Sequence, residues 1–416
     1  MVQHGWYHLG KGTYRDLNFK IFPVRRFQGS PVNFDPADKH GQQSFDDLVE
    51  ALKPDIVFTV TDYDRIGHLI SSIHRHTYQL VAYLPLDNFP PPPGWAEAIR
   101  GPDKLVYYTE FAKLWGETLG VQGPDLPHGV DTKLFKPADP EVRQAIRKRL
   151  FQMDDDGILI GTCGRNLPRK QLQLLIEAMA YLRHGAYSKC SHCGNLVSHD
   201  FELPARVFNE PPACPTCNQE ALVPGKAWPQ LKANLHTDPD ETPRIPIRHL
   251  INFWRADDCI YLNRTLKTGK GDGVPDDQLA STYQCLDAYV HTASGGGWEL
   301  PPLEAAACGL PIVAVDAPAH GQWIRGLPGR VMVRGNEQWC PLSSGYRIYA
   351  TAAAVAQGIL TYLEDPERMR KDGEVNHPFV HDHYDWSAIS LEWEKLFLEM
   401  LNPETRVAGW RVLREV

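Results

Sequence analysis

The chain has 416 residues, more than one ordinary hydrophobic core requires, and this length fits two domains. Its hydrophobic fraction of 43% and charged fraction of 23% are those of a soluble globular protein. The formal net charge of −8 argues against a protein that coats nucleic acid through general basicity, but it leaves room for a local basic groove.

The N-terminal residues, the lengths of the apolar runs and the cysteines bear on the cellular compartment of the protein. No run approaches the roughly 20 apolar residues of a membrane span, and residues 1–6 lack the basic and then apolar regions of a secretory signal. Nine cysteines is an odd number, and four of them form two Cys-x-x-Cys pairs, which suit metal better than disulfides. We therefore expect a protein of the reducing cytoplasm.

The first third of the chain alternates short apolar runs with helical stretches. Residues 44–52 are amphipathic, and strands are expected at 18–24, 54–60, 79–84 and 104–108. Such alternation predicts a parallel sheet with helices on both faces, whose ligands bind at the carboxyl ends of the strands. A proline-rich break at 89–95 follows one strand end and is either a rigid wall of a binding cleft or a plain surface loop.

A second alternating pattern follows a boundary near residues 127–140. Strands are expected at 157–164, 232–236, 259–262, 288–291 and 311–315, and a closing helix at 386–401. The sequence therefore predicts two α/β domains of Rossmann type.

Two cysteine pairs interrupt the second pattern. They are separated by about twenty residues, which is the spacing of a tetrahedral site made by Cys190, Cys193, Cys214 and Cys217. Four thiolates leave no open position for water, so we expect a structural zinc ion. His192 or His199 could replace a sulfur, and four unligated cysteines are the plainer alternative. The insertion either braces a loop or offers a docking surface, for nucleic acid among other partners.

Residues 161–170 run from a strand through a glycine-bearing turn towards a helix. Such a turn exposes backbone N–H groups that favour an anion, and Arg165 and Lys170 add two cations. A diphosphate needs this combination, because its charge grows as it departs from a sugar. The alternative is a surface helix start with ordinary basic residues.

Residues 294–311 form the second candidate stretch. Gly295, Gly296 and Gly297 would let the backbone approach a ligand, and Glu304 is expected to open a helix of small residues and to bind sugar or ribose hydroxyls. The alternatives are a flexible loop and a carboxylate that only stabilises a helix N-terminus.

Together these stretches resemble the family-4 retaining glycosyltransferases of GT-B fold, from about Gly5 to Leu401 apart from the cysteine insertion. The resemblance implies a nucleotide-sugar donor, retention of anomeric configuration and no catalytic divalent metal. It is carried by a Gly-Arg followed by Lys, by a Leu-Pro-x-x-Glu-Ala stretch, and by segments like the family's interdomain and closing ones, in the following residues: Arg165, Lys170, Leu300, Pro301, Glu304, Ala305, Ala307, Gly309, Pro311, residues 127–137, Asp385, Trp386 and Trp393.

The resemblance also assigns roles and domains. Arg165, Lys170 and Glu304 are the expected catalytic residues by resemblance, and Glu299 is added as a carboxylate that could compensate for Gly296 if the loop has shifted. Donor contacts are expected from Gly295, Gly296, Gly297, Trp298, Leu300 and Pro301. The expected domains are an acceptor domain over 1–137, a nucleotide-sugar domain over 138–385 with the zinc insertion at 186–226, and a C-terminal helix at 386–416 that returns to the first domain.

Two positions depart from the family pattern. The family has a first glutamate eight positions before the second, where this chain has Gly296, and Glu299 stands where the family has glycine. The second departure is at the start, where residues 4–10 look like the family's second strand, so we expect its first strand and helix to be missing.

The acceptor is predicted from finer likeness. Residues 83–87, residues 235–239 and the Trp298 loop are similar to a phage and archaeal subgroup, some phage members of which are associated with sugar addition to modified DNA bases. A hydroxymethylated base in double-stranded DNA is therefore the first acceptor hypothesis, and a basic face with Arg25, Arg26 and Arg75 would favour it.

Alternatives to this acceptor and to catalysis stay open. One is a glycan or lipid-linked acceptor, and another is a non-catalytic relative that binds nucleotide sugar or DNA. Asp62, Asp87 and His128 are candidate acceptor contacts, although loop capping by Asp62 and simple packing of His128 are competing interpretations. The sequence does not indicate an oligomeric state.

Overall fold

A computed structural model describes residues 2–5, 20–23, 41–42, 45–153, 157–198, 213–241, 245–262 and 274–402. Contacts divide the chain into two compact units. Unit 1 takes the residues up to Leu86, residues 91–127 and those from Ile389 onwards, and unit 2 takes Asp87–Pro90 and His128–Ala388.

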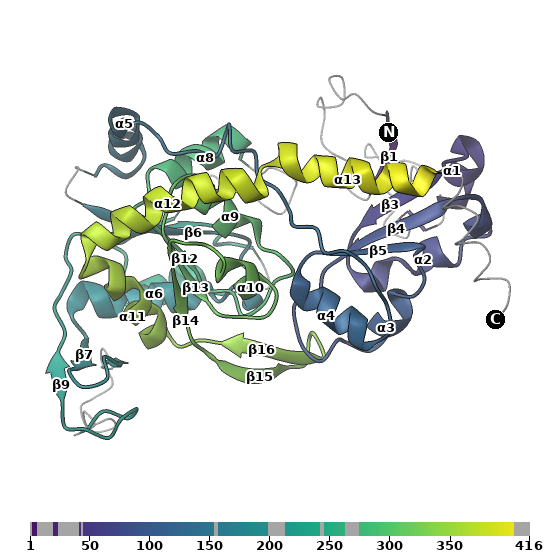
Figure 1. Ribbon diagram of the computed structural model, residues 1–416. Coiled ribbons are helices and arrows are strands. Elements are labelled where there is room, and N and C mark those ends of the chain that lie inside the picture. The colour runs from purple at the N-terminus through teal and green to yellow at the C-terminus, as the bar shows by residue number, and fades with distance from the viewer. Residues whose placement is uncertain are drawn as a thin grey trace. The chain divides into compact units, whose positions relative to one another are not determined.

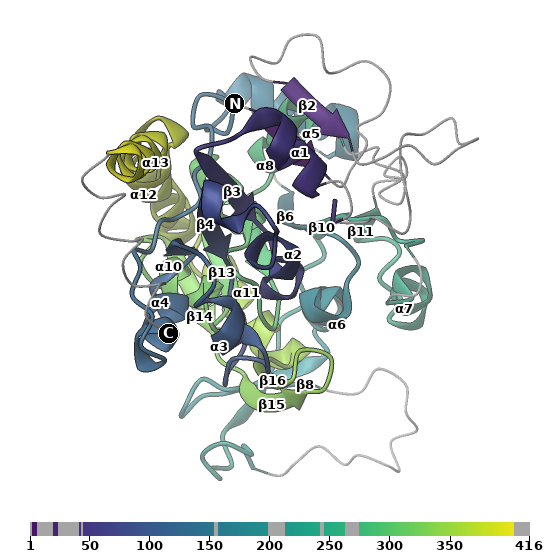
Figure 2. The same cartoon turned by 90° about the vertical axis from the view of Figure 1, so that its right-hand side faces the viewer.

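Unit 1 is built on a parallel sheet of order β3-β4-β5, and a separate parallel pair joins β1 to β2. Figure 2 shows β3 and β4 with α1, α2 and α3 around them. The elements are β1 (Val2–Gly5), β2 (Lys20–Pro23), α1 (Phe45–Leu52), β3 (Ile56–Val60), η2 (Tyr63–Arg65), α2 (Gly67–Ile70), η3 (Arg75–Thr77), β4 (Gln79–Leu84), α3 (Trp95–Ala98), β5 (Lys104–Tyr107) and α4 (Glu110–Thr118).

Strand β4 explains how this sheet is covered on both faces. Because successive side chains of a strand point to opposite faces, Leu80 and Leu84 enter one apolar core, whereas Val81 and Tyr83 enter another. The second core also contains Leu396 of helix α13 (Trp386–Leu401). The residues of α13 from Ile389 onwards therefore belong to unit 1, in which the Trp393 ring lies 4.9 Å from that of Phe58.

Unit 2 contains the longer sheet and most of the helices. Its elements are α5 (Pro140–Phe151), β6 (Ile158–Cys163), η4 (Pro168–Lys170), α6 (Leu172–His184), β7 (Tyr187–Cys190), β8 (Leu196–Ser198), β9 (Leu222–Pro224), β10 (Leu231–His236), α7 (Ile247–Phe253), β11 (Ile260–Leu262), α8 (Asp276–Gln284), β12 (Ala288–His291), α9 (Leu300–Ala307), β13 (Ile312–Val315), α10 (His320–Ile324), β14 (Arg330–Val333), β15 (Asn336–Cys340), β16 (Gly345–Tyr349), α11 (Ala352–Leu363) and α12 (Pro366–Tyr384).

The main sheet of unit 2 is parallel throughout, in the order β11-β10-β6-β12-β13-β14. Ala288 and Val290 of β12 pack into the core that α6, α7 and α11 cover. Tyr289, between them, points to the other face and lies against Tyr283 of α8, with ring centroids 5.9 Å apart. Helices thus cover both faces of the sheet, with α6 and α11 on one face and α8 and α9 on the other (Figure 1).

The order of these strands determines where a ligand belongs. The chain starts the sheet at β6, continues outwards through β10 and β11, and then returns to add β12 on the other side of β6. The helices that follow β6 and β12, α6 and α9, therefore lie on opposite faces of the sheet. In sheets of this kind, ligands bind at the carboxyl ends of two such strands.

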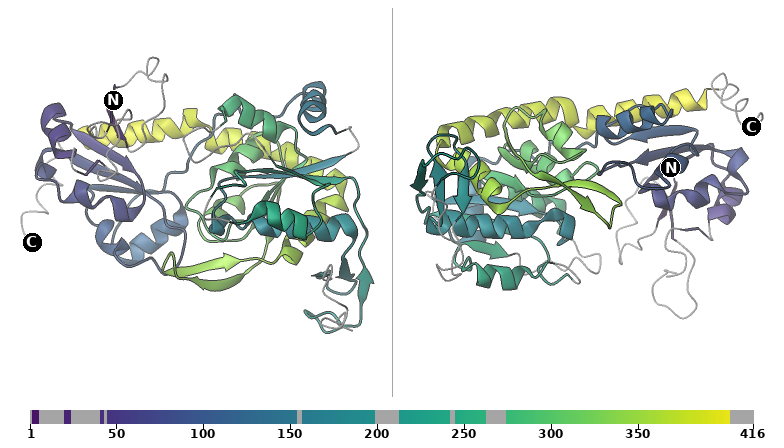
Figure 3. Two further views of the ribbon diagram at one scale, coloured as in Figure 1. Left: turned by 180° about the vertical axis from the view of Figure 1, so that it is seen from behind. Right: turned by 90° about the horizontal axis from the view of Figure 1, so that it is seen from below.

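The cysteine insertion is a small antiparallel sheet of order β8-β7-β9 between α6 and β10. In Figures 1 and 3 its β7 and β9 strands stand clear of the main sheet. The Gln357 side chain of α11 holds it through hydrogen bonds to the Leu196 N–H and the Gly194 carbonyl. The insertion is thus attached to the helical layer of unit 2.

The predicted strands and the predicted closing helix are found in the described residues. Residues 79–84, 288–291 and 386–401 match β4, β12 and α13 in full, and the other predicted strands differ from the observed ones by one or two residues at an end. Strand β14, the hairpin of β15 and β16, and helix α12 are additional. Of the expected early strand at 4–10, only residues 4 and 5 are described, as part of β1.

Candidate functional site

The candidate site lies where β6 and β12 end. After β6 the chain forms the short helix η4, passes Gln171 in a left-handed conformation with φ of 50°, and begins α6 at Leu172. The backbone of this turn is fastened to the loop after β12. The Thr292 hydroxyl donates to the Lys170 carbonyl at 2.7 Å, and the Ser294 N–H donates to the Arg169 carbonyl at 2.8 Å. The two loops are therefore one rigid assembly at the position predicted by the strand order.

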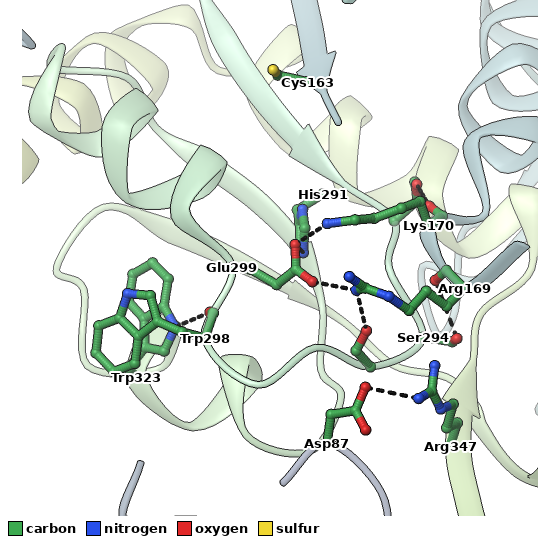
Figure 4. Close-up of polar contacts among 12 residues, drawn as sticks. Asp87, Cys163, Arg169, Lys170, His291, Ser294, Trp298, Glu299, Trp323 and Arg347 are labelled. Carbon is green, nitrogen blue, oxygen red and sulfur yellow. Dashed lines mark hydrogen bonds and ion pairs between the residues drawn. The ribbon is translucent and has the colours of Figure 1, made fainter. Parts of the chain in front are cut away.

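Two cations meet one carboxylate inside this assembly. Arg169 Nη1 donates to Glu299 Oε1 at 2.5 Å, and Lys170 Nζ donates to Glu299 Oε2. Figure 4 shows both side chains reaching Glu299, with His291 beside the oxygen that Lys170 contacts. The Glu299 and Lys170 side chains are only 4% and 9% exposed, so water screens this contact weakly.

Burial and charge set the protonation of this cluster. Burial alone would raise the pKa of Glu299, but Lys170 and Arg169 outweigh it and hold that pKa well below its usual range. Burial lowers the pKa of Lys170, and the Glu299 carboxylate opposes this shift. His291 lies 3.8 Å from Glu299, and desolvation holds its pKa well below the usual value, so its imidazole is neutral. The cluster therefore brings two basic side chains to one ionised carboxylate.

The glycine loop between Ser294 and Glu299 is held by neighbours on every side. The Gly295 carbonyl accepts from Arg169 at 3.0 Å, and Gly296 forms a bridge with Ala319. The Trp298 ring stacks on Trp323 with centroids 5.1 Å apart, and the Trp298 carbonyl accepts from Trp323 Nε1 at 2.7 Å. The structure therefore gives this loop a defined conformation in place of the flexible loop considered from the sequence.

Glycine is required here by space. A Cβ on Gly295 would lie 2.8 Å from the Asp87 carbonyl oxygen, and a Cβ on Gly296 would overlap the carboxylate of Glu299. Leu300 and Pro301 form the first turn of the helix that follows the loop.

Glu304 is placed by that helix. Helix α9 begins at Leu300, so the expectation that Glu304 opens the helix is wrong, because the chain enters helical conformation directly after Glu299. Tyr283 Oη donates to Glu304 Oε2 at 2.8 Å. Burial raises the pKa of Glu304 to about 7, although the tyrosine opposes the shift. This carboxyl therefore exchanges its proton near neutral pH.

Arg165 is directed to a different partner from Lys170. Its Nε donates to Glu241 Oε1 at 3.1 Å, while the Asn166 N–H donates to Glu241 Oε2 at 3.1 Å. The Arg165 side chain is 56% exposed. In the described structure, Arg169 and Lys170 both contact Glu299. Arg165 instead pairs with Glu241 on the exposed side of the turn.

The three candidate acceptor residues lie in different settings. Asp87 belongs to unit 2 by its contacts and accepts from Arg347 at 2.7 Å, so its expected placement in the first domain is wrong. Asp62 follows β3 in unit 1, makes no side-chain cap to η2, and pairs with Arg65 at 3.4 Å. His128 lies edge-on to Trp298 at 5.8 Å, and burial lowers its pKa to about 4.

Some residues of the site have no role in the sequence-based prediction. Arg169 and Ser294 stand within the quoted stretches, but whether Arg165 or Arg169 joins Lys170 at Glu299 depends on the fold. Cys163, His236 and His291 end the neighbouring strands β6, β10 and β12, and that common position could have identified them. Cys163 lies apart from the Glu299 cluster (Figure 4).

The four cysteines of the insertion converge. The Cys190 and Cys217 sulfurs are 3.7 Å apart, those of Cys193 and Cys214 are 3.6 Å apart, and all four lie within 4.8 Å of one another. Each pair closes the same turn, with Gly194 N–H donating to the Cys190 carbonyl and Asn218 N–H to the Cys214 carbonyl, both at 2.8 Å. Four sulfurs at about 2.3 Å from zinc are about 3.8 Å from one another in a regular tetrahedron, so the cluster fits this ion.

Several further expectations concern surfaces. Arg25, Arg26 and His199 lie outside the described residues. Arg75 donates to Asp103 at 2.7 Å within unit 1 and is only 20% exposed, so it contributes little to a basic face. Among the described residues, no helix combines the length and apolar character needed to cross a bilayer.

Comparisons with known proteins give relatives of low identity. No protein-family model matches the chain. A putative glycosyltransferase of Sulfolobus islandicus filamentous virus is 25% identical over 130 residues, which cover 30% of this chain and 37% of that protein. The lipopolysaccharide core biosynthesis mannosyltransferase LpsB of Rhizobium meliloti is 24% identical over 234 residues, which cover 56% of this chain and 51% of that protein. The chain thus spans about half or less of the length of these curated relatives.

Solved structures show the fold. Sucrose-phosphate synthase of Thermosynechococcus elongatus superposes with a TM-score of 0.65 at 14% identity, covering 92% of this chain and 88% of that chain. HepE of Anabaena in complex with UDP-glucose superposes with a TM-score of 0.59 at 13% identity, covering 92% and 86%. The prediction of a GT-B fold with two Rossmann-like α/β units is confirmed.

Proposed function

We propose that the chain is a glycosyltransferase that moves a sugar from a nucleotide-sugar donor to a hydroxyl group of an acceptor. The observation that carries this proposal is the buried Lys170, which meets Glu299 together with Arg169 at the carboxyl ends of β6 and β12. A glycosyl donor releases a diphosphate, and fixed cations in a weakly screened site stabilise that charge as it develops. The GT-B fold and the names of both relatives support this assignment.

In the proposed reaction the bond between the anomeric carbon and the phosphate oxygen breaks. The electron pair of that bond leaves with the diphosphate, and the acceptor oxygen bonds to the anomeric carbon with retention of configuration. The proton of the acceptor hydroxyl passes to the phosphate oxygen of the departing diphosphate. Lys170 and Arg169 would neutralise the departing diphosphate, and Arg165, which Glu241 holds, would contribute less. We assign no protein nucleophile and no catalytic divalent metal.

The donor's other groups would meet the loop and helix that follow β12. Glu304 would accept hydrogen bonds from ribose or sugar hydroxyls, with Tyr283 holding its other oxygen. The backbone of Gly295, Gly296 and Gly297 would approach the donor closely, and Trp298, Leu300 and Pro301 would shape its surroundings.

We also propose that Cys190, Cys193, Cys214 and Cys217 hold a structural zinc ion. Their sulfur separations match a tetrahedral site, and a fourfold thiolate shell leaves no position for a substrate. All nine cysteines are free of disulfides, which favours the reducing cytoplasm as the place of action.

For the acceptor we propose a hydroxymethylated base in double-stranded DNA, as in phage-type DNA modification. The viral source of one relative supports this choice. A glycan or lipid-linked acceptor is the second candidate, because the other relative is named as a mannosyltransferase of lipopolysaccharide core biosynthesis. Mass spectrometry of both acceptor classes after incubation with the enzyme would decide between them.

A non-catalytic nucleotide-sugar or DNA-binding relative is the competing proposal, favoured by the glycine at position 296. The test is a screen of UDP, GDP, ADP and dTDP sugars, with hydroxymethylcytosine DNA and oligosaccharides as acceptors. We expect turnover with at least one donor, measured as released nucleoside diphosphate, and loss of turnover in K170M. Saturable nucleotide binding with neither transfer nor hydrolysis would support the competing proposal.

A further inference from the structure

The side chain of Glu299 occupies the space in which residue 296 would place its own side chain. A Cβ built on Gly296 would overlap Oε1 of Glu299 and lie 2.6 Å from its Cδ and 2.7 Å from its Cγ. The carboxylate therefore folds back over the glycine and lies beside its α-carbon. A carboxylate carried by residue 296 would begin from this same place.

The backbone at Glu299 is unusual in a way that points to a functional demand. Its φ of 73° and ψ of 93° lie in a region that side chains other than glycine rarely adopt. The chain thus has a glutamate at position 299, where the backbone conformation favours glycine. It has a glycine at position 296, where the Glu299 carboxylate fills the side-chain space. Strain of this kind persists only when surrounding contacts enforce it, and the stacking of Trp298 on Trp323 fixes the preceding residue.

The partners of Glu299 leave it capacity for a ligand. A carboxylate has about four lone-pair positions, and the contacts with Arg169 and Lys170 use one on each oxygen. His291 Nε2, on a side chain that is 3% exposed, lies 3.8 Å away and has no hydrogen-bond partner in the described part of the chain. A polar ligand beside this carboxylate would meet acceptor positions and an unsatisfied imidazole nitrogen together.

Charge selects which part of a nucleotide sugar can face Glu299. The diphosphate is anionic and is attracted to the two cations, whereas a carboxylate repels it. Sugar hydroxyls are neutral donors and match the remaining lone pairs of the carboxylate. The side of the cluster occupied by Glu299 thus suits the sugar, and the side occupied by Lys170 and Arg169 suits the diphosphate.

Building on the proposed function, we infer that Glu299 is the specificity-determining carboxylate for the hydroxyls of the donor sugar, supplied from position 299 into the side-chain space of position 296. The glutamate has in effect exchanged places with a glycine within one loop. The exchange should be reversible, so the double substitution G296E/E299G should return the carboxylate to the same region from the other position.

The experiment compares four variants by calorimetric binding and by initial rates. The probes are UDP with UDP-glucose and GDP with GDP-mannose, and the pair that binds the unmodified protein is used throughout. E299G should weaken binding of the sugar nucleotide at least about tenfold while changing binding of the nucleoside diphosphate less, and should lower turnover about 100-fold. E299Q should show a smaller loss, because its amide still accepts one hydrogen bond.

The exchanged variant carries the decisive outcome. G296E/E299G should regain at least about tenfold in turnover over E299G, whereas G296E alone should be impaired because its side chain overlaps Glu299. The exchanged protein should also melt at or above the temperature of the unmodified protein, since glycine relieves the backbone at position 299. E367Q removes an exposed carboxylate paired with Arg370 on α12 and serves as the matched control, with unchanged turnover.

Two results would overturn the inference. One is an exchanged variant that folds and binds the nucleoside diphosphate but turns over no better than E299G. The other is E299G with unchanged preference for the sugar nucleotide. If the unmodified protein binds neither UDP nor GDP, nor any other nucleoside diphosphate of the screen, the proposed function itself fails and the inference falls with it.

Discussion

The cysteine insertion and the Lys170 cluster are both small polar sites, but they are assembled in opposite ways. In the insertion, each pair of sulfurs comes from one tight turn, and the two turns are about twenty residues apart in sequence. In the cluster, Lys170 meets Glu299 across 129 positions of the chain, and the sheet must form before they can touch. A local site can thus be recognised from spacing, whereas a site built by topology depends on which neighbouring side chain turns inwards.

The two sites also lie at opposite edges of the main sheet of unit 2. The cluster lies at the carboxyl ends of β6 and β12, whereas the insertion precedes β10 and therefore joins the sheet at the amino ends of its parallel strands. Damage to one should therefore leave the chemistry of the other largely intact. The following substitutions test this separation.

The largest effect is expected for K170M. Removing a buried cation from the diphosphate position should lower kcat/KM by about 10² to 10³. It also leaves Glu299 with one fewer partner, which should lower the free energy of unfolding by about 3 kcal/mol. Steady-state kinetics and thermal melting measure both effects. K189M, which removes a half-exposed lysine of the insertion, is the control, and equal losses in the two variants would contradict the assignment.

The next effect distinguishes two arginines four positions apart. R169A should lower kcat/KM about 10- to 100-fold, because a charge-assisted contact beside the buried carboxylate is lost. R165A should cost about fivefold or less, because this side chain is 56% exposed and its ion pair with Glu241 is screened. A larger loss in R165A would show that this arginine leaves Glu241 for the donor.

Glu304 should give the donor site a pH dependence. With a pKa of about 7, this carboxyl is mostly protonated at pH 6 and mostly ionised at pH 8. The ionised form is the better acceptor, so the donor KM should fall several-fold as pH rises through 7. E304Q should flatten this profile, and a profile unchanged in E304Q would remove Glu304 from the donor contacts.

The same group affects stability with a defined sign. The pKa of Glu304 is raised in the folded protein, so the folded state binds its proton more tightly than the unfolded chain does. The resulting stabilisation is full below the ordinary glutamate pKa of about 4.5 and is lost as pH rises through about 7. Melting temperatures of E304Q and of the unmodified protein over this pH window measure this contribution.

The smallest effect on turnover is expected for C214S. A serine hydroxyl is a poor substitute for a thiolate, so the zinc content should fall from one ion per chain towards zero. Because the insertion is remote from Lys170, turnover should change by less than about threefold. Elemental analysis and kinetics provide the two readouts, with C340S, a cysteine outside the cluster, as the control. Retained zinc would contradict the proposed site.

The helices, the strands and the cysteine cluster could largely be predicted from the sequence. Part of the Lys170 cluster could not, because its residues meet only in the folded sheet. Apolar runs predict β4, β6 and β13 because buried parallel strands need nearly continuous hydrophobic side chains. Spacing alone predicts the cysteine cluster. The pairing of Arg165 with Glu241 spans 76 positions, and no local pattern identifies such a partner.

The position of the Glu299 side chain also could not be predicted from the sequence. The sequence places a glycine at 296 and a glutamate at 299, but only the backbone geometry brings the Glu299 side chain back over Gly296. The direction of a side chain in a left-handed backbone conformation is a tertiary property. The sequence therefore offers Glu299 as a candidate carboxylate, but it does not place its side chain over Gly296.

The two ends of the cysteine insertion lie close together, and this has a consequence for how such chains can diversify. The backbone N–H of Trp228 donates to the Leu182 carbonyl at 2.9 Å, and a Cβ on Gly185 would lie 3.2 Å from the Ala227 backbone nitrogen. The chain after the insertion therefore lies close to the point where the insertion begins. The path from α6 to β10 could be spliced across that point by a turn of a few residues. Related proteins could thus gain, exchange or lose the cysteine insertion in a single insertion or deletion event, without a change in the strand order of the main sheet.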